Sequence, residues 1–231
     1  MRVIANDKLI KRNRIISQVT SLVSLLILGI GLYLSVYKTD MMIYSFIALI
    51  VGFMLSQVGI YYGGKYGKSP RPDELLTANL KGLEDKYSLY HYSFIVPHLL
   101  LGPSGVWILV PMHQGGTITY DPKKDRWKQK GGNFYMKIFG QENLGRPDLE
   151  VNSYIRDFNN FLDKEFPGQE PLSPQALLVF TNPKVTIQVK DAPFQALSIN
   201  KFKDFIRKKG KVSPAKQEMI AKIQEFIGEP K

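Results

Sequence analysis

Two apolar segments without a charged residue lie near the N-terminus, at residues 15–37 and 41–64. Each is long enough, at about 1.5 Å of helical rise per residue, to cross a hydrocarbon core of about 30 Å. Only residues 38–40 separate them. The sequence therefore predicts a tight hairpin of two transmembrane helices.

Basic residues flank both outer ends of this hairpin. Those before it are Arg2, Lys8, Lys11, Arg12 and Arg14, and those after it are Lys65, Lys68 and Arg71. Because lysine and arginine concentrate on the cytoplasmic side of spans, we expect a multi-pass protein of the cell membrane with both termini and the following domain in the cytoplasm. A cleaved signal peptide is the alternative for the first segment. That segment exceeds the roughly 7–15 apolar residues of a signal core, and a second span follows at once.

Polar residues inside the spans predict how the two helices pack. Gln18 and Gln57 fall at similar depth in an antiparallel hairpin, which predicts a hydrogen bond between the helices. The small residues that would permit close approach are Ser17, Ser21, Ser24, Gly52 and Ser56. The spans contain no Asp, Glu, His, Lys or Arg, which argues against a transport or channel role.

Composition restricts the chemistry of the remaining chain. The 231 residues include no cysteine, which excludes disulfides and thiolate zinc sites. The net charge of +11 makes anionic lipid head groups and nucleic acid the natural neighbours of a domain beside a membrane.

Helical and strand patterns alternate after a glycine- and proline-rich linker. The expected organisation is a basic N-terminus at 1–14, the hairpin at 15–64, the linker at 65–72 and an α/β domain at 73–231. Helical patterns cover residues 73–82, residues from 149 onward, 201–209 and 214–227. Strand patterns cover residues 94–101, 106–110, 117–120, 176–181 and 185–189. This order predicts an α/β sandwich.

Three motifs of this domain carry a family resemblance. They are Glu74-Leu-Leu with Leu80-Lys-Gly-Leu83, Tyr87-Ser-Leu-Tyr-His91, and His98-Leu-Leu-Leu-Gly-Pro-Ser-Gly-Val-Trp-Ile-Leu-Val110. Together they resemble the nuclease-related domain, or NERD domain, over residues 73–181. The resemblance implies a core similar to restriction-endonuclease-like folds and invites comparison with a metal-dependent nuclease site.

The family's site has a glutamate on the opening helix, an aspartate before the Gly-Pro hairpin and a Glu-x-Lys on the strand after it. Glu74 matches the glutamate, but Pro97 falls at the aspartate position, and Val110 and Met112 fall at the Glu-x-Lys positions. A shift of one residue gives Pro111 and His113 instead.

One acidic ligand does not hold Mg²⁺ well. We therefore expect a catalytically degenerate copy without a cofactor, acting as a binding or scaffold module. The alternative is an active nuclease that uses Mg²⁺ with relocated ligands on nucleic acid near the membrane.

Two further patterns leave alternatives open. Asp121-Pro122-Lys123 has the Asp-x-Lys spacing of a displaced site, although it is also strong turn chemistry, which we prefer. His91, His98 and His113 share one strand region, which suggests a zinc or manganese site. Their spacing matches no established ligand pattern, so we expect structural histidines and no bound metal.

Two basic clusters interleave cations with aromatic residues. The first comprises Lys123, Lys124, Arg126, Lys128 and Lys130 around Trp127, and the second comprises Arg207, Lys208, Lys209 and Lys211 after Phe202 and Phe205. Nucleic-acid surfaces combine charge and stacking in this way. The preferred interpretation is that the aromatic rings lie in the core beneath a solvated basic face. An anionic lipid surface is preferred to nucleic acid as a partner because the linker holds the domain beside the membrane.

Overall fold

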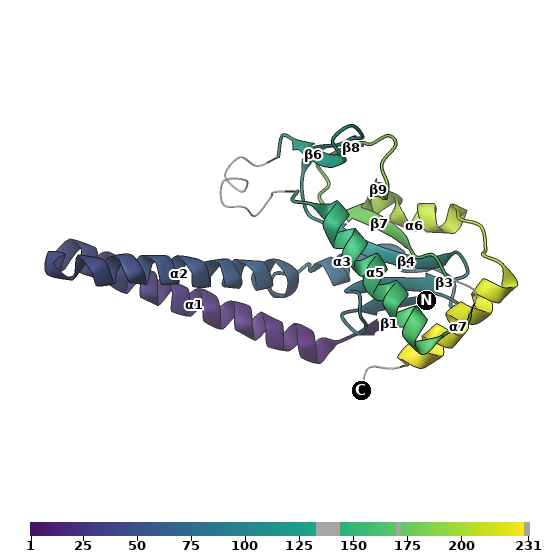
Figure 1. The fold of residues 1–231 in the computed structure, drawn as a ribbon, viewed down its shortest axis with the longest axis horizontal. Helices are drawn as coiled ribbons and strands as arrows, with labels where there is room; N and C mark the ends of the chain where they lie inside the picture. Colours follow the sequence, from purple (N-terminus) through teal and green to yellow (C-terminus); the bar gives the residue numbers. More distant parts are fainter. Residues whose placement is uncertain (133–143, 170–171, 229–231) are drawn as a thin grey trace. The chain divides into compact units, whose positions relative to one another are not determined.

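The structure is a computed structural model that describes residues 1–132, 144–169 and 172–228. It divides into two compact units, drawn in Figure 1. One is a helical hairpin, Asp7–Arg71, and the other is an α/β unit formed by Met1–Asn6 together with Pro72–Lys231.

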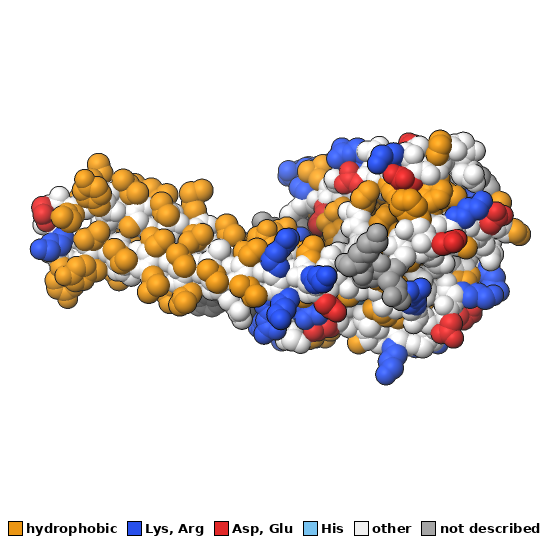
Figure 2. Space-filling model, turned by 90° about the horizontal axis from the view of Figure 1, so that it is seen from below, with side chains coloured by type: hydrophobic (Ala, Val, Ile, Leu, Met, Phe, Trp, Pro, Cys, Tyr) orange, Lys and Arg blue, Asp and Glu red, His pale blue; other side chains and the backbone are white. Residues whose placement is uncertain are grey.

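The hairpin consists of α1, Asp7–Tyr37, and α2, Met42–Tyr62, joined by the short turn η1, Thr39–Met41, and followed by η2, Gly63–Gly67. α1 begins at Asp7, ahead of the apolar run at Ile15, so the largely polar residues 7–14 form the first turns of the same helix. Both helices are long and apolar enough to cross a membrane, and only 11% and 17% of their apolar stretches are buried. Figure 2 shows this apolar surface in orange. A core helix of a soluble protein would be covered, so the exposed surface indicates membrane association.

The helices pack through small residues that recur every seven positions. Those of α1 are Ser17, Ser24 and Gly31, and those of α2 are Ser45, Gly52 and Gly59; all are buried. The Ser17 hydroxyl donates a hydrogen bond to the Gly59 carbonyl at 2.9 Å, and Ser45 donates to the Gly31 carbonyl at 2.7 Å. A Cβ atom at Gly52 would lie 2.8 Å from Leu28 Cγ, so glycine permits the close approach there.

The predicted contact between Gln18 and Gln57 is wrong, because both side chains are exposed. Successive residues of a helix are rotated by about 100°, so Gln18 points away from the stripe that contains Ser17. Among the residues expected to permit close approach, Ser17, Ser24 and Gly52 are buried. The Ser56 hydroxyl instead donates to the Phe53 carbonyl of its own helix.

The α/β unit contains two sheets. The larger has the strand order β1-β2-β3-β4-β7-β9, and the smaller has the order β6-β5-β8. The strands of the larger sheet are β1 Arg2–Ala5, β2 Ser88–His91, β3 His98–Gly102, β4 Gly105–Met112, β7 Gln175–Phe180 and β9 Gln195–Ser198. Those of the smaller sheet are β5 Gly116–Asp121, β6 Arg126–Lys130 and β8 Val185–Gln188. The helices are α3 Pro72–Leu80, α5 Pro147–Glu165, α6 Ile199–Lys208 and α7 Pro214–Ile227.

Helices cover both faces of the larger sheet (Figure 1). Leu100, Trp107 and Leu109 lie in one cluster with Leu76 of α3 and Phe202 of α6. The alternate residues Leu99, Leu101 and Ile108 lie in a second cluster with Phe158 of α5 and Ile220 of α7. This alternation is that of a sheet buried on both faces. The predicted mixed α/β class is confirmed.

The helical and strand patterns of the sequence correspond to α3, α5, α6 and α7 and to β3, β4, β5, β7 and β8. Four strands were not predicted, and β1 has the largest consequence because residues 1–14 were expected to form only a basic N-terminus. β1 pairs in parallel with β2, with Ile4 opposite Tyr90. A strand of four residues that runs into a helix is too short to show an alternating pattern.

The carboxyl ends of β1, β2, β4, β7 and β9 lie at one edge of the larger sheet, which we call the carboxyl edge. β1 is parallel to β2, two antiparallel pairings through β3 make β2 parallel to β4, and β4, β7 and β9 are parallel. The chain leaves this edge at Asn6 toward α1, and it returns to the α/β unit at Pro72. β4 and β7 continue from the same edge into β5 and β8 of the smaller sheet.

Candidate functional site

The positions at which the resemblance to the NERD family would place a nuclease site do not face one another. Glu74 lies in the first turn of α3, half-buried, on the side of the sheet that Trp107 and Leu109 face. Val110 and Met112 point to the other side, where they are buried in an apolar cluster with Trp127, Val151 and Phe180. Side chains of adjacent strand residues point to opposite faces. A glutamate at residue 110 and a lysine at residue 112 would therefore not face Glu74.

The strand residues that face α3 are those one position away, Pro111 on β4 and His98 on β3. Pro111 alternates in phase with Leu109 and is half-buried. On β3, His98 rather than Pro97 alternates in phase with Leu100. The carboxyl edge thus presents His98 and Pro111 toward α3.

Two histidines at this edge form a buried pair. His91 and His98 are directly opposite each other in the β2–β3 pairing, and their exposed fractions are 1% and 3%. Their Nδ1 atoms lie 2.9 Å apart. The Thr77 hydroxyl lies 2.9 Å from the Nε2 atom of His91, and the Tyr92 ring packs against the His98 ring. We call Thr77, His91 and His98 the histidine chain.

The histidine chain commits three of the four ring nitrogens of this pair to hydrogen bonds. A neutral imidazole has one N–H donor and one bare nitrogen acceptor, so a hydrogen bond between two Nδ1 atoms needs one of each. Both Nδ1 atoms are therefore engaged with each other. His113 is exposed. Within residues 1–132, 144–169 and 172–228, no three His, Asp or Glu side chains gather as a metal site.

Asp121 belongs to the turn between β5 and β6, as the preferred interpretation predicts. Its Oδ1 atom accepts a hydrogen bond from the Lys123 backbone N–H at 3.1 Å, and its Oδ2 atom accepts one from Lys128 Nζ at 2.7 Å. The Lys128 hydrogen bond holds the pKa of Asp121 below its ordinary value. The Tyr120 hydroxyl donates to the Asp125 carboxylate, which raises the pKa of Tyr120 to about 12. The ammonium group paired with Asp121 is that of Lys128, whereas Lys123 of the displaced-site alternative contacts Asp121 through its backbone N–H.

Trp127 of the first basic cluster and Phe202 of the second lie in the core, and Phe205 is half-buried against it. Trp127 is 5% exposed and packs on Tyr120 across the strand pair, with ring centroids 5.4 Å apart. On α6, Phe202 is fully buried. These rings are therefore not available to stack on nucleic-acid bases, in agreement with the preferred interpretation.

Two of the predicted anion-binding cations on and after α6 have partners within the unit. Arg207 donates to the Gly82 carbonyl at 2.9 Å, beyond the end of α3. The Lys209 ammonium lies 4.9 Å from the ring centre of Phe205. Lys208 and Lys211 are exposed. The cluster therefore serves in part to join α6 to α3.

Sequence reasoning missed the histidine chain because it did not predict β2. The three histidines were noticed, but only the pairing of β2 with β3 shows that His91 faces His98 while His113 lies beyond the end of β4.

Comparison of the chain with protein-family models, curated proteins and solved structures finds no match.

Proposed function

We propose that this protein is a membrane-anchored, NERD-like binding or scaffold module whose nuclease-like site is catalytically inactive. The histidine chain supports the proposal most directly. It fills the α3-facing side of the carboxyl edge with side chains already hydrogen-bonded to one another. A Mg²⁺ site would need several oxygen ligands there. The motifs around Glu74 and the Gly102-Pro103 hairpin support the family assignment.

The position of β1 supports the predicted topology. β1 precedes the hairpin, yet it pairs with β2, which follows the hairpin. Both outer ends of the hairpin are thus joined to one folded unit, which requires that residues 1–6 and the α/β unit lie on the same side of the membrane. Cleavage of the first span as a signal peptide would remove this strand from the sheet. The flanking lysines and arginines favour the cytoplasmic side for this unit.

Cysteine labelling in intact cells tests the topology. Because the chain has no cysteine, single substitutions Thr39→Cys in the loop and Lys190→Cys in the α/β unit give unambiguous sites. Both residues are exposed. We expect a membrane-impermeant maleimide to label Thr39→Cys and to label Lys190→Cys only after the membrane is permeabilised. The reverse pattern would overturn the orientation, and labelling of both sites in intact cells would contradict a membrane-crossing hairpin.

A cleavage assay separates the inactive module from the alternative, a metal-dependent nuclease with relocated ligands. The purified full chain is expected to leave DNA and RNA intact with Mg²⁺ or Mn²⁺, because the carboxyl edge lacks the family's aspartate and Glu-x-Lys. Glu74→Ala is the matched control that distinguishes intrinsic activity from a contaminant. Cleavage that co-purifies with the protein and disappears in Glu74→Ala would establish the nuclease alternative.

A further inference from the structure

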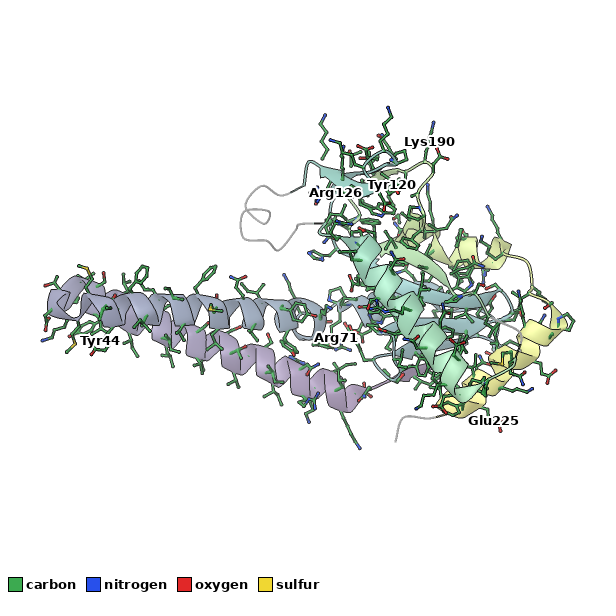
Figure 3. All side chains as sticks on the ribbon, viewed as in Figure 1. Tyr44, Arg71, Tyr120, Arg126, Lys190 and Glu225 are labelled. Atoms are coloured by element: carbon green, nitrogen blue, oxygen red, sulfur yellow. The ribbon has the colours of Figure 1, made fainter. Side chains whose placement is uncertain are left out.

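The outer face of the smaller sheet is polar and rich in cations. The residues of this face, identified by alternation and pairing, are Thr117, Thr119 and Asp121 of β5, Arg126, Lys128 and Lys130 of β6, and Thr186 and Gln188 of β8. We call this set the basic face. Figure 3 labels Arg126 on β6 and Lys190 after β8, which mark the two outer strands of the sheet.

The opposite face of the same sheet fixes the basic face in place. Ile118 is fully buried, and Trp127 and Ile187 lie in the same apolar cluster as Phe180 of the larger sheet. The cations of β6 therefore project from a strand held by the core. The basic face carries no aromatic side chain, because Tyr120 and Trp127 alternate to the inner side.

Positive charge exceeds negative charge around this face. Its one carboxylate, Asp121, accepts a hydrogen bond from Lys128, and Asp125 in the adjoining turn accepts one from Tyr120. Arg126 and Lys130 are exposed on the face itself. The surrounding exposed cations are Lys123 and Lys124 in the turn and Lys184 and Lys190 on either side of β8, with Asp191 following Lys190.

The smaller sheet is attached at the carboxyl edge, from which the chain also departs toward the hairpin. β5 follows the carboxyl end of β4 after residues 113–115, and α1 follows the carboxyl end of β1 after Asn6. If the hairpin spans a bilayer, only residues 7–14 connect Asn6, at the end of β1, to the apolar run that enters it. Anionic head groups attract nearby lysine and arginine side chains.

We infer that the basic face binds anionic lipid head groups of the membrane that holds the hairpin, an inference that rests on the proposed membrane anchoring. A lipid surface presents many negative charges in one plane, which suits a sheet face of solvated cations and hydroxyl groups. Recognition of single-stranded nucleic acid commonly adds stacking on aromatic rings, and the rings of this sheet face the core. The charge and the geometry of the basic face thus favour lipid.

The full chain in lipid nanodiscs provides the test. A donor dye on Thr186→Cys, the single cysteine, reports energy transfer to acceptor dyes on the head groups. We expect transfer to rise about twofold when phosphatidylserine replaces about 30% of phosphatidylcholine, and to return to the neutral-lipid value at 1 M salt, where the Debye length is about 3 Å. Transfer that is independent of phosphatidylserine would overturn the inference.

Two matched triple substitutions locate the effect. Arg126→Gln, Lys128→Gln and Lys130→Gln together remove three charges from the basic face and are expected to abolish the rise. Lys201→Gln, Lys208→Gln and Lys211→Gln remove three exposed charges from α6 and its following segment, and they are expected to preserve it. Unchanged tryptophan fluorescence verifies that each variant is folded. An equal loss in both variants would show a general effect of net charge and would overturn the assignment to the basic face.

Nucleic acid is a separate outcome of the same set of variants. The detergent-solubilised chain could bind RNA or DNA and lose this binding only in the triple variant of Arg126, Lys128 and Lys130. If energy transfer in nanodiscs were also independent of phosphatidylserine, nucleic acid would replace lipid as the ligand. Failure of the chain to enter nanodiscs would instead overturn the membrane anchoring. It is recognised by the absence of protein from the disc fraction, whereas failure of the lipid inference leaves the protein in the discs.

Discussion

Replacing Ile4 with proline is expected to lower the free energy of unfolding of the α/β unit by about 3–5 kcal/mol. Ile4 is 5% exposed and belongs to the same apolar cluster as Leu99 and Phe158. The N–H groups of Arg2 and Asn6 donate to the Tyr87 and His91 carbonyls of the β2 segment. Because backbone N–H groups point alternately to the two sides of a strand, the N–H of Ile4 points toward β2, as those of Arg2 and Asn6 do. Proline removes this donor together with the buried side chain.

Val3→Pro is the matched control, because its N–H points to the open side of an edge strand and its side chain is 41% exposed. A cost of about 0.5 kcal/mol is expected there. Urea unfolding of the full chain in detergent measures both variants. The only two tryptophans, Trp107 and Trp127, are buried in the α/β unit and report its unfolding. Equal effects of the two substitutions would show that β1 does not support the sheet.

The stability of the α/β unit is expected to fall by about 2 kcal/mol between pH 7 and pH 5 because of the histidine chain. With both Nδ1 atoms in one hydrogen bond, at least one of the two imidazoles stays neutral in the folded state. Unfolded histidine binds a proton near pH 6.5. The unfolded state therefore takes up more protons as the pH falls, so the contribution is present above about pH 6.5 and is lost below it.

His98→Asn is expected to remove most of this pH dependence, because a side-chain amide bonds to either protonation state of His91. His113→Asn makes the same change at an exposed histidine and is expected to retain the wild-type dependence. The hydrogen bonds from Arg146 lower the pKa of Asp148, and this contribution is lost only at pH values below the window of the histidines. Identical slopes between pH 7 and pH 5 for the wild type and His98→Asn, by urea unfolding, would contradict the assignment.

Sequence reasoning predicted those parts of the fold whose signals are local. The stripe that includes Val151 and Phe158 gives α5, Pro214 after Ser213 marks the start of α7, and Gly102-Pro103 gives the turn from β3 to β4. Each depends on spacing within one turn or one helix, which the sequence shows directly.

The elements that were missed depend on partners distant in sequence. β1 has one buried apolar residue, Ile4, and becomes a strand because the edge of β2 is available to it. For the packing of α1 on α2, the close approach at Gly52 was predicted, whereas the approach at Gly59 was missed and the contact expected between Gln18 and Gln57 does not form. The sequence shows directly that Pro97, Val110 and Met112 are not the family's aspartate, glutamate and lysine, but that His98 and Pro111 face α3 instead of these residues required the strand register.

The pairing of β1 with β2 has a consequence for biosynthesis. β1 is synthesised first, but β2 begins only at Ser88, so at about 5–20 residues per second the first strand waits for its partner for about 4–17 s. Both helices of the hairpin are made during that interval. If only one of them crossed the bilayer, the two strands would lie in different compartments and the edge of β2 would stay open. Completion of the sheet thus depends on correct insertion, and a mis-inserted chain would expose an unpaired strand edge of the kind that promotes aggregation.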